Sequence, residues 1–286
     1  LDREQVKAFA AKNITIKDKE GFWSRGIAKV KKGNWLIYVS DTEKGYAKVR
    51  TQDGKIGYVK KNKLANFETA REAMKQEKQI QGKVNLAWDY FSEYHTAPNR
   101  KGSSIEGINV VAPAFFNLNS KGEFHENVGK DGENYIEWAH SNGYKVWPLV
   151  MSNSNDGIDM RSEILNDYEK RQKLIEAIVN MCVKYKLDGI NLDFEYMYEK
   201  DKDAFSRLII ELEPRMKEIG AVISVDVTAP DGAPTWSLCF DRNVIGDVAD
   251  YIIFMAYDQN SGKKAGTGAG YNWVETNLKK IIQYDQ

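Results

Sequence analysis

The stretch that most constrains this chain is Leu187–Tyr196, which reads LDGINLDFEY. Its side chains alternate with the two-residue period of a β-strand, three apolar residues against three polar ones: Ile190, Leu192 and Phe194 against Asn191, Asp193 and Glu195. The apolar face suits a parallel strand covered by helices. The polar face would then point into a sheet or barrel interior, where unpaired carboxylates are costly. Carboxylates that are kept in such a position despite this free-energy cost indicate a functional site. A pair of carboxylates is typical of glycoside hydrolysis and of acid/base catalysis.

Strands and helices alternate from residue 83 onward. The candidate strands are 84–91, 108–117, 145–151, 189–195, 221–229 and 251–257, and candidate helices include 132–142, 161–186 and 202–219. This alternation predicts a parallel α/β architecture, with functional residues at the carboxyl ends of the strands. The polar residues at such ends are Asn117, Ser152, Glu195, Tyr257 and Asp258.

The N-terminal part of the chain has a different pattern. Short strand-like segments lie at 14–16, 26–30, 35–39, 46–50 and 55–59, and Asp53-Gly54 is a hairpin signal. They predict a small all-β barrel. Residues 67–82 are rich in Glu, Lys, Gln and Ala, which predicts a solvated linker helix.

The formal net charge of zero hides an asymmetry. Residues 1–83 hold 20 Lys and Arg against 10 Asp and Glu, whereas residues 84–286 hold 21 against 31. A basic N-terminal module fits an anionic partner such as cell wall, membrane surface or nucleic acid. A merely solvated lysine-rich surface is the alternative, because no lysine cluster is dense enough to define a site.

Other functional classes find no support in the sequence. No apolar run approaches the roughly 18 residues of a membrane helix, so no membrane span is predicted. The two cysteines and three histidines form no metal-ligand spacing, and we predict neither a metal site nor a cofactor. Residues 1–4 show no signal-peptide pattern, so the N-terminus does not decide the question of export.

The run from residue 188 to 195 resembles the signature of family 18 glycoside hydrolases, which are chitinase-like (β/α)8 barrels. The family pattern is Asp-x-x-Asp-x-Asp-x-Glu at the end of the fourth barrel strand. Here Asp188, Asp193 and Glu195 match it, and Asn191 replaces one acid. An amide cannot exchange a proton, so we expect a proton relay through Asp193 that is simpler or absent, one negative charge fewer and a changed pH profile.

Two further segments strengthen this resemblance. Met255-Ala256-Tyr257-Asp258 resembles the family's Met-x-Tyr-Asp at the end of strand six, with one candidate strand between the two motifs. Residues 110–124 resemble the second strand and following turn of the spore and cell-wall branch of the family. The resemblance covers residues 83–286. A (β/α)8 barrel has eight strands and typically about 250 residues. Only six candidate strands are visible, so we expect a barrel truncated after strand six, as a fragment or completed by another copy.

The resemblance implies roles for the motif residues. Glu195 would protonate the glycosidic oxygen and then activate water, while Asp193 would orient the substrate's acetamido group and stabilise an oxazolinium cation. The substrate's own N-acetyl oxygen would be the nucleophile, with retention of configuration. Tyr257 would hydrogen-bond the acetamido oxygen. The predicted substrate-binding residues are Asp258, Met255, Asn191, Asp188 and, as a sugar-stacking platform, Phe116.

Structural alternatives exist for these residues. Asp193 and Glu195 could form a buried ion pair, although no basic residue occupies an inward position of a candidate strand. Tyr257 could be a core tyrosine and Met255 plain core packing. The aromatic residues Phe115, Trp88, Trp147 and Trp236 are further stacking candidates, but strand aromatics more often belong to the core.

The N-terminal segment, with KKGNWLIYV and GYAKVRTQDGKIGYVKKNKL, resembles bacterial SH3-like domains, which often tether enzymes to peptidoglycan. We therefore predict an SH3-like domain at 1–66, a linker at 67–82 and a partial family 18 barrel at 83–286. The implied function is hydrolysis of β-1,4 linkages in N-acetylglucosamine-containing glycans, peptidoglycan before chitin, at the cell envelope, the spore surface or outside the cell. No nucleic-acid partner is predicted. The alternative is a non-catalytic glycan-binding or wall-anchoring protein.

Overall fold

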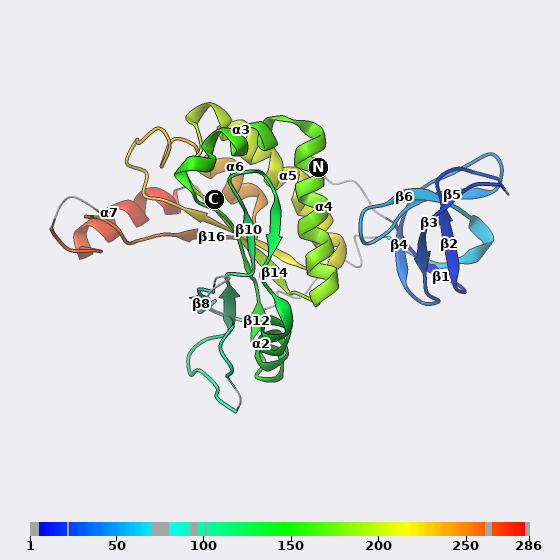
Figure 1. Cartoon of the computed structure of the whole chain (residues 1–286), viewed down its shortest axis with the longest axis horizontal. Coiled ribbons are helices and arrows are strands. Elements are labelled where there is room, and N and C mark those ends of the chain that lie inside the picture. The colour runs from blue at the N-terminus through cyan, green and yellow to red at the C-terminus, as the bar shows by residue number, and fades with distance from the viewer. Residues whose placement is uncertain are drawn as a thin grey trace. The chain divides into compact units, whose positions relative to one another are not determined.

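The structure is a computed structural model that describes residues 6–21, 23–69, 80–91, 97–100, 102–260 and 265–283. The chain divides into two compact units, Leu1–Gln79 and Ile80–Gln286. Figure 1 shows an all-strand N-terminal unit and a mixed C-terminal unit.

Unit 1 is an antiparallel sheet of seven strands, in the order β3-β2-β6-β5-β4-β1-β7. The strands are β1 Val6–Ala10, β2 Ile14–Lys17, β3 Gly26–Val30, β4 Trp35–Asp41, β5 Tyr46–Arg50, β6 Ile56–Lys60 and β7 Leu64–Thr69. The five strands predicted from the sequence are confirmed, and β1 and β7 are additional. The Asp53-Gly54 turn joins β5 to β6, with Gly54 at a φ of 82° that a glycine adopts without strain.

The predicted linker helix is wrong where the structure describes it. Residues 67–69 belong to β7, which pairs with β1 and so has its backbone hydrogen bonds in the sheet. Residues 70–79 lie outside the described residues. Ile80 is buried against Val110, Trp147 and Val222 of unit 2.

Unit 2 contains all six predicted strands. Its strands are β8 Leu86–Asp89, β9 Val110–Pro113, β10 Phe116–Leu118, β11 Phe124–Glu126, β12 Lys145–Val146, β13 Leu149–Ser152, β14 Gly189–Phe194, β15 Val222–Val227 and β16 Tyr251–Phe254. Two predicted strands are interrupted, one between β9 and β10 and one between β12 and β13. The second break falls at Trp147-Pro148, where proline has no N–H to donate to a neighbouring strand.

The unit 2 strands form a parallel array apart from the short hairpin strand β11. One sheet has the order β11-β10-β13-β14-β15-β16 and the other β12-β9-β8. A hydrogen bond from the Asp188 N–H, just before β14, to the Val146 carbonyl of β12 connects the two sheets. Following the chain, the parallel neighbours are therefore β8, β9/β10, β12/β13, β14, β15 and β16. Their carboxyl ends lie at one edge. The expectation that the barrel is truncated after strand six stays a prediction.

The helices of unit 2 follow the strands. They are α2 Gly129–Ser141, α3 Ile158–Asn166, α4 Tyr168–Tyr185, α5 Lys202–Ile219, α6 Arg242–Val248 and α7 Tyr271–Ile282, with short 3₁₀ turns at Asn155–Gly157 and Glu199–Asp201. The single helix predicted over 161–186 is wrong. Asp167 has an extended backbone between α3 and α4, and its carboxylate accepts the Lys170 N–H as the N-cap of α4.

The core of unit 2 lies between this array and its helices. Every residue of β14 is buried, and its apolar face joins one cluster with side chains of α4, α5 and β15. Figure 1 shows α3, α4, α5 and α6 grouped beside the strands β10, β14 and β16. The apolar half of the β14 alternation therefore packs on helices, which leaves its polar half facing the interior of the array.

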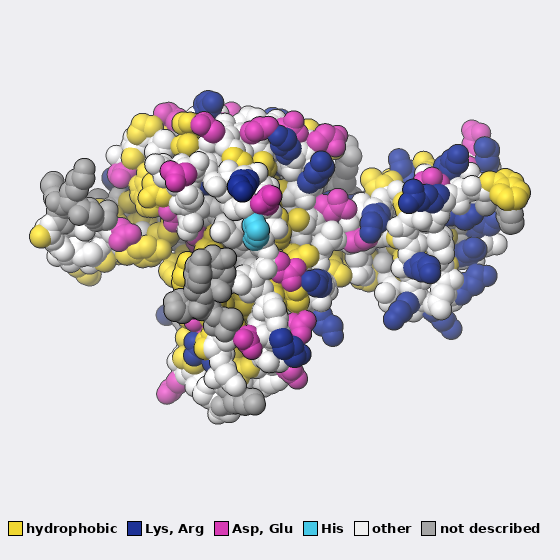
Figure 2. Space-filling model, viewed as in Figure 1, with side chains coloured by type: hydrophobic (Ala, Val, Ile, Leu, Met, Phe, Trp, Pro, Cys, Tyr) yellow, Lys and Arg dark blue, Asp and Glu magenta, His cyan; other side chains and the backbone are white. Residues whose placement is uncertain are grey.

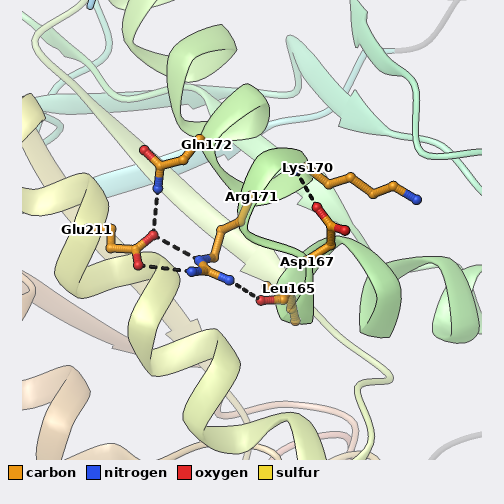
Figure 3. Close-up of polar contacts among 6 residues, drawn as sticks. All are labelled: Leu165, Asp167, Lys170, Arg171, Gln172 and Glu211. Carbon is orange, nitrogen blue, oxygen red and sulfur yellow. Dashed lines mark hydrogen bonds and ion pairs between the residues drawn. The ribbon is translucent and has the colours of Figure 1, made fainter.

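An ion pair between a buried arginine and a partly buried glutamate links α4 to α5 (Figure 3). The Arg171 guanidinium donates to both carboxylate oxygens of Glu211, at 2.8 and 3.0 Å, and to the Leu165 carbonyl at 2.7 Å. Gln172 adds a third hydrogen bond to Glu211. Because Arg171 is almost fully buried, this bidentate pair fixes the relative position of the two helices that cover β14.

Charge is distributed unevenly over the two units. On the face shown in Figure 2, Lys and Arg outnumber acids on unit 1, whereas both signs are interspersed on unit 2. Both cysteines, Cys182 and Cys239, are free and buried. Among the described residues no cluster of three His, Cys, Asp or Glu could hold a metal ion. No described helix has the length and apolar composition of a membrane span.

Candidate active site

The polar side of β14 brings two predicted acids to the carboxyl end of the array. Asp193 lies within β14, and Glu195 follows directly, its N–H donating to the Ser152 carbonyl of β13 at 3.1 Å. This backbone bond continues the parallel ladder one step beyond the strand. Glu195 is therefore held at the rim, while Asp193, 8% exposed, lies one step deeper.

Asp193 is a buried carboxyl with few donors. Asn153, just after β13, offers its amide to Oδ2 at 3.4 Å, and Oδ1 receives no hydrogen bond from any described residue. Burial raises the pKa of Asp193, and hydrogen bonding with Glu195 and Asn153 opposes that rise. An unpartnered buried acceptor next to a second acid can accept a proton or a ligand N–H.

Glu195 has the properties of a general acid. Burial raises its pKa to about 8, with further contributions from the negative charges of Asp193 and Asp258, and the Arg161 guanidinium opposes the shift. A carboxyl with this pKa is largely protonated at neutral pH. It can then donate a proton to a leaving group and later act as a base.

Asn191 lies between two partners that fix its amide. Its Oδ1 accepts the indole N–H of Trp88 at 2.7 Å, and its Nδ2 donates to Asp226 Oδ1 at 2.8 Å. Asp226 comes from β15 and is 2% exposed. Asp226 was not predicted from the sequence as a site residue, although Ser224, Asp226 and Thr228 show the same polar alternation as β14.

Strand β16 brings the second motif to the same edge. The Met255 N–H donates to the Val227 carbonyl of β15, and Met255 itself is buried. Tyr257 is 45% exposed and meets Trp88 edge to face, with ring centroids 6.1 Å apart. The pKa of Tyr257 is raised, first by burial and then by the negative charges of four acids: Asp226, Asp193, Glu195 and Asp258. The two motifs, 60 residues apart, therefore meet in one site.

Arg161 is a second residue that the sequence analysis missed. It projects from α3, is fully buried, and donates to Ser152 Oγ, the Ser154 carbonyl and the Tyr196 carbonyl at 3.2, 2.6 and 3.1 Å. The sequence prediction considered basic residues at inward strand positions only, whereas Arg161 acts electrostatically on Glu195 from a helix.

Two predicted substrate contacts do not lie at this site. Asp188 precedes β14, at the amino end of the array, and its carboxylate accepts from Lys145 Nζ and the Val146 N–H. Phe116 is 1% exposed and stacks on Phe124 inside the core. Both predictions are corrected. Asp188 lies at the amino end of its strand, away from the acids, and the Phe116 ring has no accessible face on which a sugar could stack.

The aromatic residue that the structure does bring to the site is Trp88. Its side chain is partly exposed, and it lies between Asn191 and Tyr257. Trp147 is fully buried against Tyr251. Trp236 is half-buried and packs on Tyr196, the residue after Glu195.

Comparison with known proteins agrees with this geometry. Residues 87–282 match the profile of Glycosyl hydrolases family 18, and this match spans most of the chain. The chain therefore belongs to glycosyl hydrolase family 18. Trp88, Asn191, Asp193, Glu195, Asp226 and Tyr257 all fall within the matched range.

Three curated relatives illustrate the similarity. The "Uncharacterized glycosylase YvbX" of Bacillus subtilis is 25% identical over 69% of this chain and 56% of its own length. The "Putative sporulation-specific glycosylase YdhD" of B. subtilis is 28% identical over 49% of this chain and 34% of its own, and the "Cortical fragment-lytic enzyme" of Bacillus anthracis is 27% identical over 50% and 34%. The chain thus spans between a third and somewhat over half of these relatives.

Solved structures share the fold. The C-terminal domain of a putative chitinase from Desulfitobacterium hafniense superposes with a TM-score of 0.59 at 19% identity, covering 71% of this chain and 63% of that one. The "putative sporulation-specific glycosylase ydhD" from B. subtilis gives a TM-score of 0.55 at 22% identity, covering 59% of this chain and 57% of that one. Unit 2 therefore has the TIM-barrel type of fold found in family 18 glycosidases.

Proposed function

We propose that this chain cleaves β-1,4 linkages next to N-acetylglucosamine by a retaining, substrate-assisted mechanism. The observation that carries the proposal is the carboxyl pair of Asp193 and Glu195 at the carboxyl end of β14. One acid is buried with an unpartnered oxygen, and the other lies at the rim with a pKa of about 8. A general acid beside an ionisable partner is the arrangement that this hydrolysis needs.

The roles follow from these positions. Glu195 donates its proton to the glycosidic oxygen as the bond to the anomeric carbon breaks, and the substrate's acetamido oxygen forms the new bond to that carbon. Asp193 Oδ1 accepts the acetamido N–H, which increases the nucleophilicity of the acetamido oxygen and stabilises the cationic ring. Glu195 then removes a proton from the water that opens this ring. Tyr257 donates its hydroxyl proton in a hydrogen bond to the acetamido oxygen. Asn191 and Met255 form the base of the subsite that binds the N-acetylglucosamine ring, and Asp258 lines the same subsite.

Peptidoglycan is the substrate we favour, with chitin second. Relatives with the names glycosylase and cortical fragment-lytic enzyme support an envelope or spore glycan, and "Probable chitinase 2" of Drosophila melanogaster supports the second choice. We also propose that unit 1 is an SH3-like module whose excess of Lys and Arg binds the anionic wall. These proposals place the protein at the spore surface, in the cell envelope or outside the cell.

Hydrolysis can be tested with one substitution and a matched control. Wild type, Glu195→Gln and Glu199→Gln are assayed on N-acetylglucosamine oligomers and on purified peptidoglycan. Glu199 is an exposed acid four residues on. Loss of the general acid should lower turnover by about 10²–10⁴-fold, with Glu199→Gln unchanged. Equal turnover in wild type and Glu195→Gln would refute the acid role.

The second candidate function is glycan binding without cleavage. It is supported by the rings of Trp88 and Tyr257, which meet edge to face and are 39% and 45% exposed, because such rings can hold a sugar whether or not cleavage follows. Isothermal titration with an N-acetylglucosamine oligomer separates the two functions. Binding by wild type without turnover would support the binding protein and contradict the enzyme.

A further inference from the structure

We propose that Asp226 of β15 is the acid that shares a proton with Asp193, in place of the acid that Asn191 removes from β14. This inference rests on the proposed function, since it concerns the same carboxyl pair. It makes Asp226 a positioning residue that acts through Asp193. It also corrects the expectation that the site has lost an acid: the neighbouring strand supplies one.

The orientation of Asn191 identifies Asp226 as the acceptor. An indole N–H can only donate, so the atom of Asn191 that faces Trp88 at 2.7 Å must be the amide oxygen. The amide NH₂ therefore faces Asp226 Oδ1 at 2.8 Å. A buried amide fixed at both ends holds the Asp226 carboxyl in one position.

Strand register places Asp226 beside Asp193. In the parallel pairing of β14 with β15, Asn191 is opposite Ser224 and Leu192 opposite Val225. Asp193 and Asp226 are the next residues of the two strands after this paired segment, and the charge of Asp193 acts on Asp226. Both lie on the polar side of their strands and both are buried. Two acids in such positions cannot both ionise without a large electrostatic cost.

The surroundings of Asp226 favour its neutral form. Burial raises its pKa most, the charges of Asp193 and Glu195 raise it further, and only the Asn191 amide opposes them. From β16, Tyr257 faces the same group of acids and its own pKa is raised by Asp226. The charged groups that act on Asp226 in the described part of the chain are therefore acids.

A proton held on Asp226 has a clear use. With Asp226 neutral, Asp193 can carry the single negative charge of the buried pair and stabilise a cationic ring. When Asp193 is protonated instead, the proton passes to it from Asp226 once the two carboxyl groups come within hydrogen-bond distance. The pair then titrates as one unit, with macroscopic pKa values that belong to both acids.

The first test needs no activity, so it remains valid if the proposed function fails. Infrared spectra at neutral pH compare wild type with Asp226→Asn and with Asp167→Asn, a helix cap on the surface. We expect Asp226→Asn to lose one protonated-carboxyl band, since full burial can raise a carboxyl pKa by about 3–5 units, and Asp167→Asn to lose none. An unchanged band in Asp226→Asn would overturn the proposal.

A measurement on wild type covers the case in which Asp226→Asn does not fold. In ¹³C-aspartate NMR, at least one Asp carboxyl should still be protonated at about neutral pH, for the same reason of burial. If every Asp carboxyl of the folded protein is ionised by that pH, the proposal is wrong whatever the variant does.

The second test moves the acid between strands. Asp226→Asn should lower kcat/KM by about tenfold or more and remove one ionisation from its pH profile. The double variant Asn191→Asp/Asp226→Asn exchanges acid and amide and should restore both. A loss of activity with an unchanged pH profile, or no recovery in a folded double variant, would leave Asp226 a packing residue and contradict proton sharing.

Discussion

The guanidinium of Arg161 donates a hydrogen bond of 3.1 Å to the backbone carbonyl of Tyr196, the residue that follows Glu195. Tyr196 has a φ of 49°, in the left-handed region that a residue with a side chain seldom adopts. The same guanidinium donates to Ser152 Oγ at the end of β13 and to the Ser154 carbonyl just after it. Arg161 thus joins the two loops that leave β13 and β14 and fixes the turn that aims Glu195.

We predict that Arg161→Lys lowers kcat with little effect on KM. A lysine keeps the charge but cannot reach three acceptors at once, so the Tyr196 turn is released. We expect a loss of about 2–4 kcal/mol in the free energy of unfolding. Arg207→Lys, on the exposed side of α5, is the matched control.

In Arg161→Met the missing charge should move the alkaline limb of the pH–rate profile to higher pH, because Arg161 lowers the pKa of Glu195. An alkaline limb at the same pH as in wild type would contradict that electrostatic effect.

The activity should fall as pH rises through about 8, where Glu195 loses the proton it donates. Asp258 contributes to that raised pKa, so Asp258→Asn should shift the alkaline limb to lower pH. The measurement is kcat/KM from pH 5 to 10, with the surface variant Asp247→Asn as control. A limb in the same place for Asp258→Asn and wild type would contradict the electrostatic coupling.

The same carboxyl should destabilise the fold as pH rises. Its folded pKa lies above the unfolded value of 4.5, so the native state binds more protons than the unfolded state and stability falls between about pH 4.5 and about 8. Glu195→Gln removes this effect. The free energy of unfolding of Glu195→Gln, measured with denaturant, should therefore rise relative to that of wild type across this pH range. The expected rise is on the order of 1–2 kcal/mol after solvent screening is allowed for. A constant difference across the range would refute the shift.

The Arg171–Glu211 pair should matter for stability and not for chemistry. Glu211→Ala removes the hydrogen-bonded counter-charge of Arg171 and leaves its guanidinium with the Leu165 carbonyl and the charge of Asp167, at a cost of about 2–4 kcal/mol. Glu275→Ala, which breaks an exposed pair with Lys279 on α7, should cost no more than about 0.5 kcal/mol. Thermal unfolding measures both, and similar melting temperatures for the two variants would contradict the structural role.

Gly189 at the start of β14 should not tolerate a side chain. An added Cβ would lie 2.5 Å from Val222 Cγ2 and 2.8 Å from both the Val222 carbonyl and Trp147 Cδ1. Because one of these neighbours is backbone, we expect Gly189→Ala to cost about 1–3 kcal/mol. Gly268→Ala, where an added Cβ has open space, should be close to neutral. Urea unfolding midpoints that agree for the two variants would disprove the crowding.

Much of the architecture could be predicted because it depends on local pattern. Each of the six strand segments predicted for unit 2 contains a strand, and the two motifs at 188–195 and 255–258 converge because parallel strands share a carboxyl edge. The predicted 161–186 helix failed at Asp167, since a capping carboxylate breaks a run that is otherwise periodic. The linker-helix prediction failed at 67–69 because pairing with β1 overrides helical propensity.

The rest of the site depends on contacts between distant residues. Arg161 comes from a helix and reaches a carbonyl 35 positions away, so no strand pattern could reveal it. Trp88 was one aromatic among several, and only its hydrogen bond to a residue 103 positions away distinguishes it. Asp188 matched a motif but lies at the amino end of β14, which shows that motif membership does not place a side chain at the chemistry.

The crowding of acids around Asp193 also bears on the choice of ligands. Asp193 and Asp258 raise the pKa of Glu195, and Asp193 and Glu195 raise that of Asp226. All four acids raise the pKa of Tyr257, and within the described chain Arg161 is the cation that acts on Glu195. Without a bound ligand, this site holds more acidic groups than basic ones. A sugar-like ring that carries a permanent cation would supply positive charge, so inhibitor screens and co-crystallisation trials should begin with cationic azasugars in preference to neutral oligosaccharides.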